Sequence, residues 1–183
     1  MGKLLNPLNN NVMKTFRFFV TFILVSMGYP VLSQNSIFPD ISVYALDGSR
    51  MNARDIRLSD QTVVIVFWNG DDRKSLDQVR MINEEYGNGL KEKNVKVVGI
   101  CTDNSGIMER IRPLVNGIGL DFEIYIDRNN DLKRAMNVPE IPYTLIIDPV
   151  KDFYCRYSGY CANIGELITG SIDQRLAKNI DQK

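Results

Sequence analysis

Hydrophobic positions along the chain follow two different periods, and their alternation predicts a series of strands and helices. Continuous apolar runs over 63–68 and 95–101 suit central strands that are covered on both faces. Between them, residues 75–90 carry apolar side chains three to four positions apart, which is typical of an amphipathic helix. The alternation predicts an α/β fold, a central mixed β-sheet with helices on both faces.

The same patterns predict the remaining elements. A short strand over 41–46 ends in the turn Asp47-Gly48, and residues 51–56 are expected to return as its partner. The others are a helix over 107–114 capped by Asn104 or Ser105, a strand over 122–126, a helical turn over 132–136, a strand directly after Pro142, its hairpin partner over 153–157 and an amphipathic helix over 164–180.

The first 33 residues have a different character from the rest. Lys14 and Arg17 precede an apolar run of roughly ten residues, the pattern of a secretory signal peptide. The run ends at 28–30 and is shorter than the roughly 20 apolar residues of a membrane span, although an anchor is the alternative. We interpret 1–33 as an N-terminal extension with a signal peptide and 34–183 as one domain, exported to the periplasm or cell envelope, with no stable membrane span after cleavage.

Charge and composition exclude several classes of function. The chain holds 22 Lys and Arg against 22 Asp and Glu, and residues 1–33 contain three of the cations and no acid, so the remaining domain has a net charge near −3. This balance gives no electrostatic case for binding nucleic acid. The chain has no histidine, which excludes histidine-based triads and histidine-ligated metals. We expect neither a metal nor a cofactor.

Three short motifs occur in a fixed order along the chain. They are Phe38-Pro39-Asp40 with the Asp47-Gly48 turn, the strand Val64-Ile-Val-Phe-Trp68, and Ile141-Pro142-Tyr143-Thr144 followed by another strand. Over roughly residues 37–180 the chain resembles exported thioredoxin-like proteins of the TlpA/ResA type, in the thiol:disulfide oxidoreductase and AhpC-TSA-like superfamily. The resemblance implies a thioredoxin-like fold in which Pro142 is cis and faces the helix start at Asp72.

The chain departs from this family where the family's chemistry takes place. The family motif runs Phe-Trp-x-x-Trp-Cys-x-x-Cys, usually with an acid three positions later. Here Asp72 and Ser75 stand at the cysteine positions, Asp71 at the second tryptophan and Gln78 at the acid. Neither a carboxylate nor a hydroxyl forms a mixed disulfide, and no histidine can activate Ser75. We expect no catalytic residue at the degenerate positions Asp72 and Ser75, and whether the protein is an enzyme stays open.

The acids at this helix start have a structural and a functional interpretation. Aspartate is a preferred N-cap, and carboxylates there interact favourably with the helix dipole. The alternative is a polar recognition tip over residues 71–75 that contacts a partner.

The three cysteines lie elsewhere in the sequence. Cys155 and Cys161 could form a structural disulfide in an oxidising compartment, remain unpaired, or act as a redox pair. We predict that this pair lies away from Pro142. Cys101 ends an apolar strand and is expected to be a buried, inert thiol.

Two functions from different classes follow. The first is a noncatalytic module that binds a protein or peptide client in a groove between the Asp72 loop and the Ile141-Pro142 turn. Its expected binding residues are Trp68, Asp71, Asp72, Arg73, Ile141, Pro142 and Tyr143. Trp68, Tyr143 and Tyr160 would serve as apolar anchors where they are exposed, and core packing is the more usual place for Trp68. The alternative is a thiol:disulfide oxidoreductase in cell-envelope redox homeostasis that uses Cys155 and Cys161.

Overall fold

A computed structural model of the chain describes residues 38–57, 61–102, 108–148 and 153–180. The predicted signal peptide and the cap residues Asn104 and Ser105 lie outside these ranges. The described residues all belong to the unit that begins at residue 36. The proposed domain boundary after residue 33 therefore stays a prediction.

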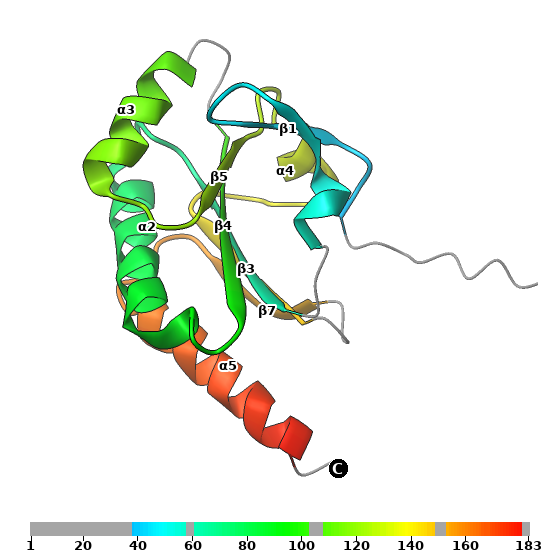
Figure 1. The fold of residues 1–183 in the computed structure, drawn as a ribbon, viewed down its shortest axis with the longest axis vertical. Helices are drawn as coiled ribbons and strands as arrows, with labels where there is room; N and C mark the ends of the chain where they lie inside the picture. The colour runs from blue at the N-terminus through cyan, green and yellow to red at the C-terminus, as the bar shows by residue number, and fades with distance from the viewer. Residues whose placement is uncertain (1–37, 58–60, 103–107, 149–152, 181–183) are drawn as a thin grey trace, which may run out of the picture. The chain divides into compact units, whose positions relative to one another are not determined.

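Seven strands form one mixed sheet, in the spatial order β2-β1-β5-β4-β3-β6-β7 (Figure 1). Their bounds are β1 Ser42–Ala45, β2 Arg50–Asn52, β3 Thr62–Trp68, β4 Val95–Cys101, β5 Glu123–Ile126, β6 Tyr143–Ile147 and β7 Phe153–Ser158. The central strands β3, β4 and β5 are parallel, and the pairings of β1, β2, β6 and β7 are antiparallel. The carboxyl ends of the three parallel strands therefore meet at one edge of the sheet, where ligand sites of α/β folds gather.

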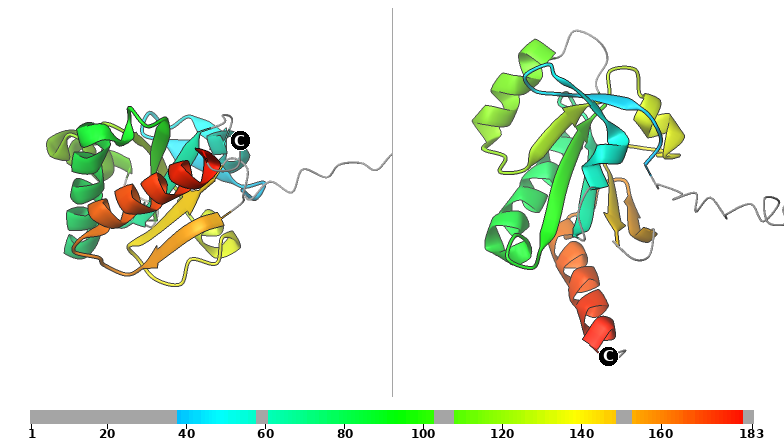
Figure 2. Two further views of the ribbon diagram at one scale, coloured as in Figure 1. Left: turned by 90° about the horizontal axis from the view of Figure 1, so that it is seen from below. Right: turned by 45° about the vertical axis from the view of Figure 1, so that its right-hand side comes forward.

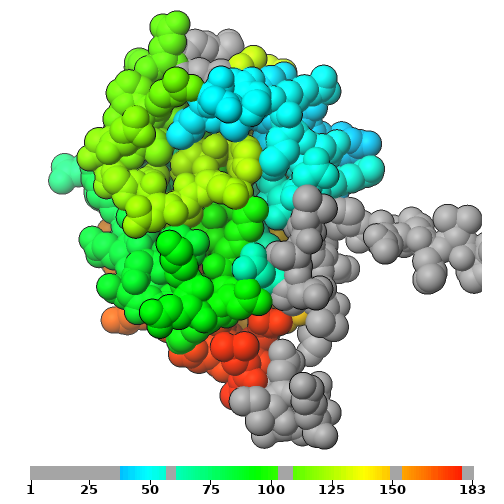
Figure 3. All heavy atoms as spheres, in the orientation of Figure 1, coloured from blue at the N-terminus to red at the C-terminus, as the bar shows by residue number. Residues whose placement is uncertain are grey.

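Helices cover both faces of this sheet, as predicted. They are η1 Ala53–Arg57, α2 Arg73–Glu85, η2 Tyr86–Leu90, α3 Met108–Ile118, α4 Asp131–Ala135 and α5 Ile164–Ile180. Helices α2, α3 and α5 lie on one face, and η1 and α4 lie on the other (Figures 1 and 2). On the face shown in Figure 3, the surface of the β1–β2 hairpin adjoins that of β5, its neighbour in the sheet.

Strand β3 contributes side chains to the hydrophobic core on both faces of the sheet, because its successive side chains point to opposite faces. Val64, Val66 and Trp68 pack with α2, α3 and α5, whereas the three residues between and before them pack with η1 and α4. Every residue of β3 is buried. This explains why the strand reads as a continuous apolar run instead of an alternating one.

The predicted strand over 51–56 is the one element that is largely wrong. Its pairing with β1 ends at Asn52, and the chain then turns into the 3-10 helix η1. The Asn52 side chain accepts a hydrogen bond from the N–H of Arg54 at 2.9 Å. Such a local bond offers the backbone an alternative to the strand ladder, so β2 stops after three residues.

Candidate functional site

The loop between β3 and α2 is built around Asp72, the N-cap of α2. One Asp72 carboxylate oxygen accepts hydrogen bonds from the N–H and the hydroxyl of Ser75 at 2.9 and 2.8 Å, and the other accepts from the N–H of Lys74 at 3.4 Å. The predicted capping role of Asp72 is therefore confirmed. The Ser75 side chain is buried, and its hydroxyl donates its hydrogen to the Asp72 carboxylate.

Hydrogen bonding sets the charge state of this cap. Burial alone raises the pKa of Asp72, but the bonds from Ser75 and Lys74 outweigh it, so the pKa lies below the usual aspartate value. The carboxylate is thus ionised at neutral pH, where it also interacts favourably with the positive end of the α2 dipole.

We expect Asp72→Ala to reduce the free energy of unfolding by about 1 kcal/mol at neutral pH, because two backbone donors lose their acceptor. A lowered pKa stabilises the fold above the unfolded value of about 3.9, and this stabilisation disappears as pH falls through the folded value. Urea unfolding at pH 7 and at pH 3 should therefore show a smaller difference between the variant and the natural chain at pH 3. Asp72→Asn, which keeps an acceptor, is the control, and an equal loss in both variants would contradict the capping role.

The Ile141-Pro142 turn lies at the same end of β3. The peptide bond between these residues is cis, as the family resemblance implied. Phe67 in β3 pairs with Tyr143 in β6, so the turn emerges level with the end of β3, where the Asp72 loop begins. A second contact fixes the turn from the other side, because the hydroxyl of Ser158 donates to Glu140 at 2.7 Å.

The expected binding residues differ in their exposure. Asp71 and Arg73 are exposed, and Asp72 and Ile141 are half-buried. Asp71 forms an ion pair with Arg110 of α3 at 3.4 Å, between two exposed side chains, so the pair adds little to stability.

Three other residues on that list require correction. The side chains of Trp68, Pro142 and Tyr143 are buried, with Trp68 completely inside the core. Trp68 ends β3, Tyr143 begins β6 and Pro142 directly precedes β6, and helices cover both faces of these two strands. The two aromatic rings therefore have no surface on which to be presented. Tyr160 is instead the exposed large hydrophobic residue of the described part of the chain, at 41%.

Gln78 is a structural residue of the site whose partners could not be read from the sequence. Its amide nitrogen donates to the hydroxyl of Thr144 at 3.1 Å, and its amide oxygen accepts from the N–H of Cys161 at 2.9 Å. The side chain is fully buried, so it joins α2, β6 and the segment after β7 with both of its polar ends satisfied. The sequence signal was a polar residue on the apolar face of an amphipathic helix.

Cys161 lies nearer to this site than predicted. The bond from Cys161 to Gln78 places it one helical turn from Ser75, because β7 runs back alongside the Pro142 turn. Cys101 is buried as expected, and Cys155 and Cys161 are not joined by a disulfide in this structure.

Both half-buried thiols lie close to one phenol. Burial raises the pKa of Tyr157, the hydrogen bond with Ser171 lowers it, and the neighbouring Cys155 and Cys161 raise it further. The Sγ atom of Cys155 lies 3.6 Å from the Ser171 hydroxyl. The two thiols therefore face the same layer between β7 and α5.

Comparisons with known proteins define the class of this fold. It is a thioredoxin-like domain, similar to the solution structure of an uncharacterized thioredoxin-like protein from Porphyromonas gingivalis (TM-score 0.66, 23% identity, covering 76% of this chain and 91% of that one). A secreted disulfide oxidoreductase of Mycobacterium tuberculosis, homologous to E. coli DsbE, is also similar in structure (TM-score 0.61, 14% identity, covering 78% and 99%).

The chain belongs to the AhpC/TSA family, whose pattern matches residues 35–152. The thiol-disulfide oxidoreductase ResA of Bacillus thuringiensis (strain Al Hakam) is a distant relative, 26% identical over 110 residues, which are 60% of this chain and 61% of ResA. The chain thus spans about three fifths of the length of this curated relative.

The part of the chain that the structure describes contains neither a candidate metal site nor a candidate membrane-spanning helix. Within it, no group of three or more Cys, Asp or Glu side chains is arranged to hold a metal ion. The helices described there are each too short or too polar to cross a bilayer.

Proposed function

We propose that this protein is an exported thioredoxin-like module that binds a protein or peptide client beside the Ile141-Pro142 turn and performs no disulfide exchange at the start of α2. The relationship to the thiol-disulfide oxidoreductase ResA supports a role among thiol-disulfide proteins. The residues at the α2 start argue against the exchange itself, because Asp72 and Ser75 form a hydrogen-bonded cap and carry no sulfur.

The main chain of Ile141 is the observation that carries the binding proposal. The β3–β6 ladder stops at Tyr143, and no described residue forms a hydrogen bond with the N–H or C=O of Ile141. Ile141 is a half-buried residue, and it precedes a proline that cannot donate. An extended client chain can pair with such groups by strand addition, which requires no sulfur chemistry.

Tyr160 supplies the apolar contact for the same client. It follows Gly159, whose Cα lies against the carboxylate of Glu140, and Ser158 pairs with Tyr143. These contacts hold residues 158 and 159 beside the turn, and the exposed Tyr160 follows directly after them. Exposed aromatic side chains of this kind are common anchors of protein interfaces.

A photoreactive phenylalanine analogue at position 160 tests the proposal. We expect it to cross-link to one discrete client in an envelope preparation, to the same extent with and without reductant, because no mixed disulfide is involved. The matched control carries the analogue at Lys178 in α5, away from the turn. Equal labelling at both positions, or labelling that reductant abolishes, would contradict the proposal.

A second candidate function uses Cys155 and Cys161 for thiol:disulfide exchange. The observation in its favour is that both thiols are free and lie next to Tyr157. Their spacing differs from the Cys-x-x-Cys arrangement that serves exchange in the family, and Cys155 lies within strand β7. We therefore rank this function second.

A further inference from the structure

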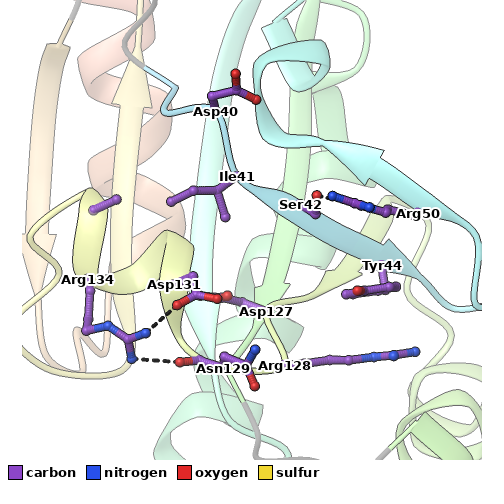
Figure 4. A pocket seen from close by; sticks show the side chains of 11 residues that line it. Asp40, Ile41, Ser42, Tyr44, Arg50, Asp127, Arg128, Asn129, Asp131 and Arg134 are labelled. Atoms are coloured by element: carbon purple, nitrogen blue, oxygen red, sulfur yellow. Dashed lines mark hydrogen bonds and ion pairs between the residues drawn. The ribbon is translucent and has the colours of Figure 1, made fainter.

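A polar hollow beside the β2–β1 edge of the sheet has no role in the proposed function. It has a volume of about 650 Å³ and lies between β1, β2 and the β5–α4 segment (Figure 4). This volume is within the range of roughly 300–1,000 Å³ that holds small-molecule ligands. None of its lining residues belongs to the groove beside Pro142.

The acids of the hollow are already committed to partners inside the protein. Asp127 caps α4 by accepting from the N–H groups of Leu132 and Lys133 at 3.2 and 2.8 Å. Asp131 pairs with Arg134, which also donates to the carbonyl of Asn129 at 2.7 Å. Asp40, at the rim, accepts from Asn52 and Arg54 at 2.6 and 3.2 Å.

Three residues of the hollow, Arg50, Ser42 and Tyr44, have hydrogen-bond donors with no partner among the described residues. Arg50 donates only from Nε, to the hydroxyl of Ser42 at 2.7 Å, so both of its terminal nitrogens are unused among the described residues. The Ser42 hydroxyl is the acceptor in that bond and keeps its own hydrogen to donate. The hydroxyl of Tyr44 likewise forms no hydrogen bond with a described residue.

The sheet register places these three donors together. Ser42 and Tyr44 are two residues apart on β1 and so lie on one face, and Arg50 is the partner of Tyr44 on β2. Figure 4 shows the Arg50 guanidinium beside the Ser42 hydroxyl and the Arg128 side chain beneath Tyr44. The guanidinium carbon of Arg128 lies 3.7 Å from the centre of the Tyr44 ring, which adds a second positive charge at this end.

We propose that this hollow binds the oxyanion of a small organic ligand, a carboxylate or a phosphate, through Arg50, Ser42 and Tyr44. The carboxylates of the hollow each hold at least one partner inside the protein, whereas Arg50, Ser42 and Tyr44 keep unused donors, so an anion is the chemistry that fits. The planar guanidinium presents parallel N–H groups that match both carboxylate and phosphate oxygens.

Titration of the full-length chain tests the site with two probes, inorganic phosphate and succinate, against sodium chloride at equal ionic strength. We expect saturable shifts of the backbone amide signals of the β1–β2 hairpin with at least one probe and none with chloride. Saturation with phosphate only, or with succinate only, supports the site and identifies the group that it recognises.

Arg50→Gln should raise the dissociation constant about tenfold or more, because it removes a charge-assisted hydrogen-bond donor. Ser42→Ala should raise it less. The matched control is Arg80→Gln, which removes another exposed arginine from α2, outside the lining of the hollow, and should leave binding unchanged. An Arg50→Gln chain that unfolds at the same temperature as the natural chain in chloride, yet binds the probes equally well, would overturn the proposal, as would shifts that chloride reproduces.

Discussion

The double variant Asp72→Cys/Ser75→Cys is expected to reduce insulin disulfides, an activity that we expect the natural chain to lack. The side chains at these positions already touch, since the Ser75 hydroxyl lies 2.8 Å from the Asp72 carboxylate. The N–H groups that now hold the carboxylate would face a thiolate at position 72. Such a helix start lowers a thiol pKa from about 8.5 toward 7 or below, which gives about tenfold more thiolate at neutral pH.

The two single variants are the controls for this experiment. Asp72→Cys has an accessible thiol at the α2 start and lacks the second thiol that resolves a mixed disulfide, so it should trap a client without turnover. Ser75→Cys has only a buried thiol and should neither trap a client nor reduce insulin. A double variant that forms its 72–75 disulfide, as measured by thiol counting, but reduces insulin no faster than the natural chain would show that the surrounding scaffold no longer supports exchange.

The replacement Trp68→Ala should have the largest effect on stability, a loss of about 3–5 kcal/mol in the free energy of unfolding. The ring is completely buried between β3 and the helices of its face. It also lies against Gly99 of β4, where the position of an added Cβ would be 3.1 Å from the indole nitrogen. The loss is a large share of the 5–15 kcal/mol by which domains are typically stable.

Tyr160→Ala is the matched control, because it also removes an aromatic ring but from an exposed position. It should change the free energy of unfolding by no more than about 0.5 kcal/mol. Urea unfolding must be followed by far-UV circular dichroism, since Trp68 is the single tryptophan of the chain. Similar losses in the two variants would contradict the placement of Trp68 in the core.

Hydrophobic periodicity was sufficient to predict most of the fold. The apolar run that ends at Trp68 and the three-to-four spacing after Ser75 are local patterns with direct structural causes, and β4 and α5 have the predicted bounds. The hairpin partner of β1 was overextended because a single side-chain bond at Asn52 decided where it ended. Periodicity does not report such a bond.

The candidate site was only partly predictable from the sequence. Asp72 was identified as a cap because capping depends on residues two and three positions away. The burial of Tyr143 and the contact between Gln78 and Cys161 depend on segments up to 83 residues apart, which no local pattern encodes. The hollow at Arg50 was missed for the same reason, because β2 and α4 meet only in the folded chain.

The most direct test of the central claim is the rate of insulin reduction by the natural chain with dithiothreitol as the electron source. We predict a rate equal to that of dithiothreitol alone, unchanged in Cys155→Ser and Cys161→Ser. A faster rate that either substitution abolishes would contradict the claim, because it would show that the protein exchanges disulfides through these thiols.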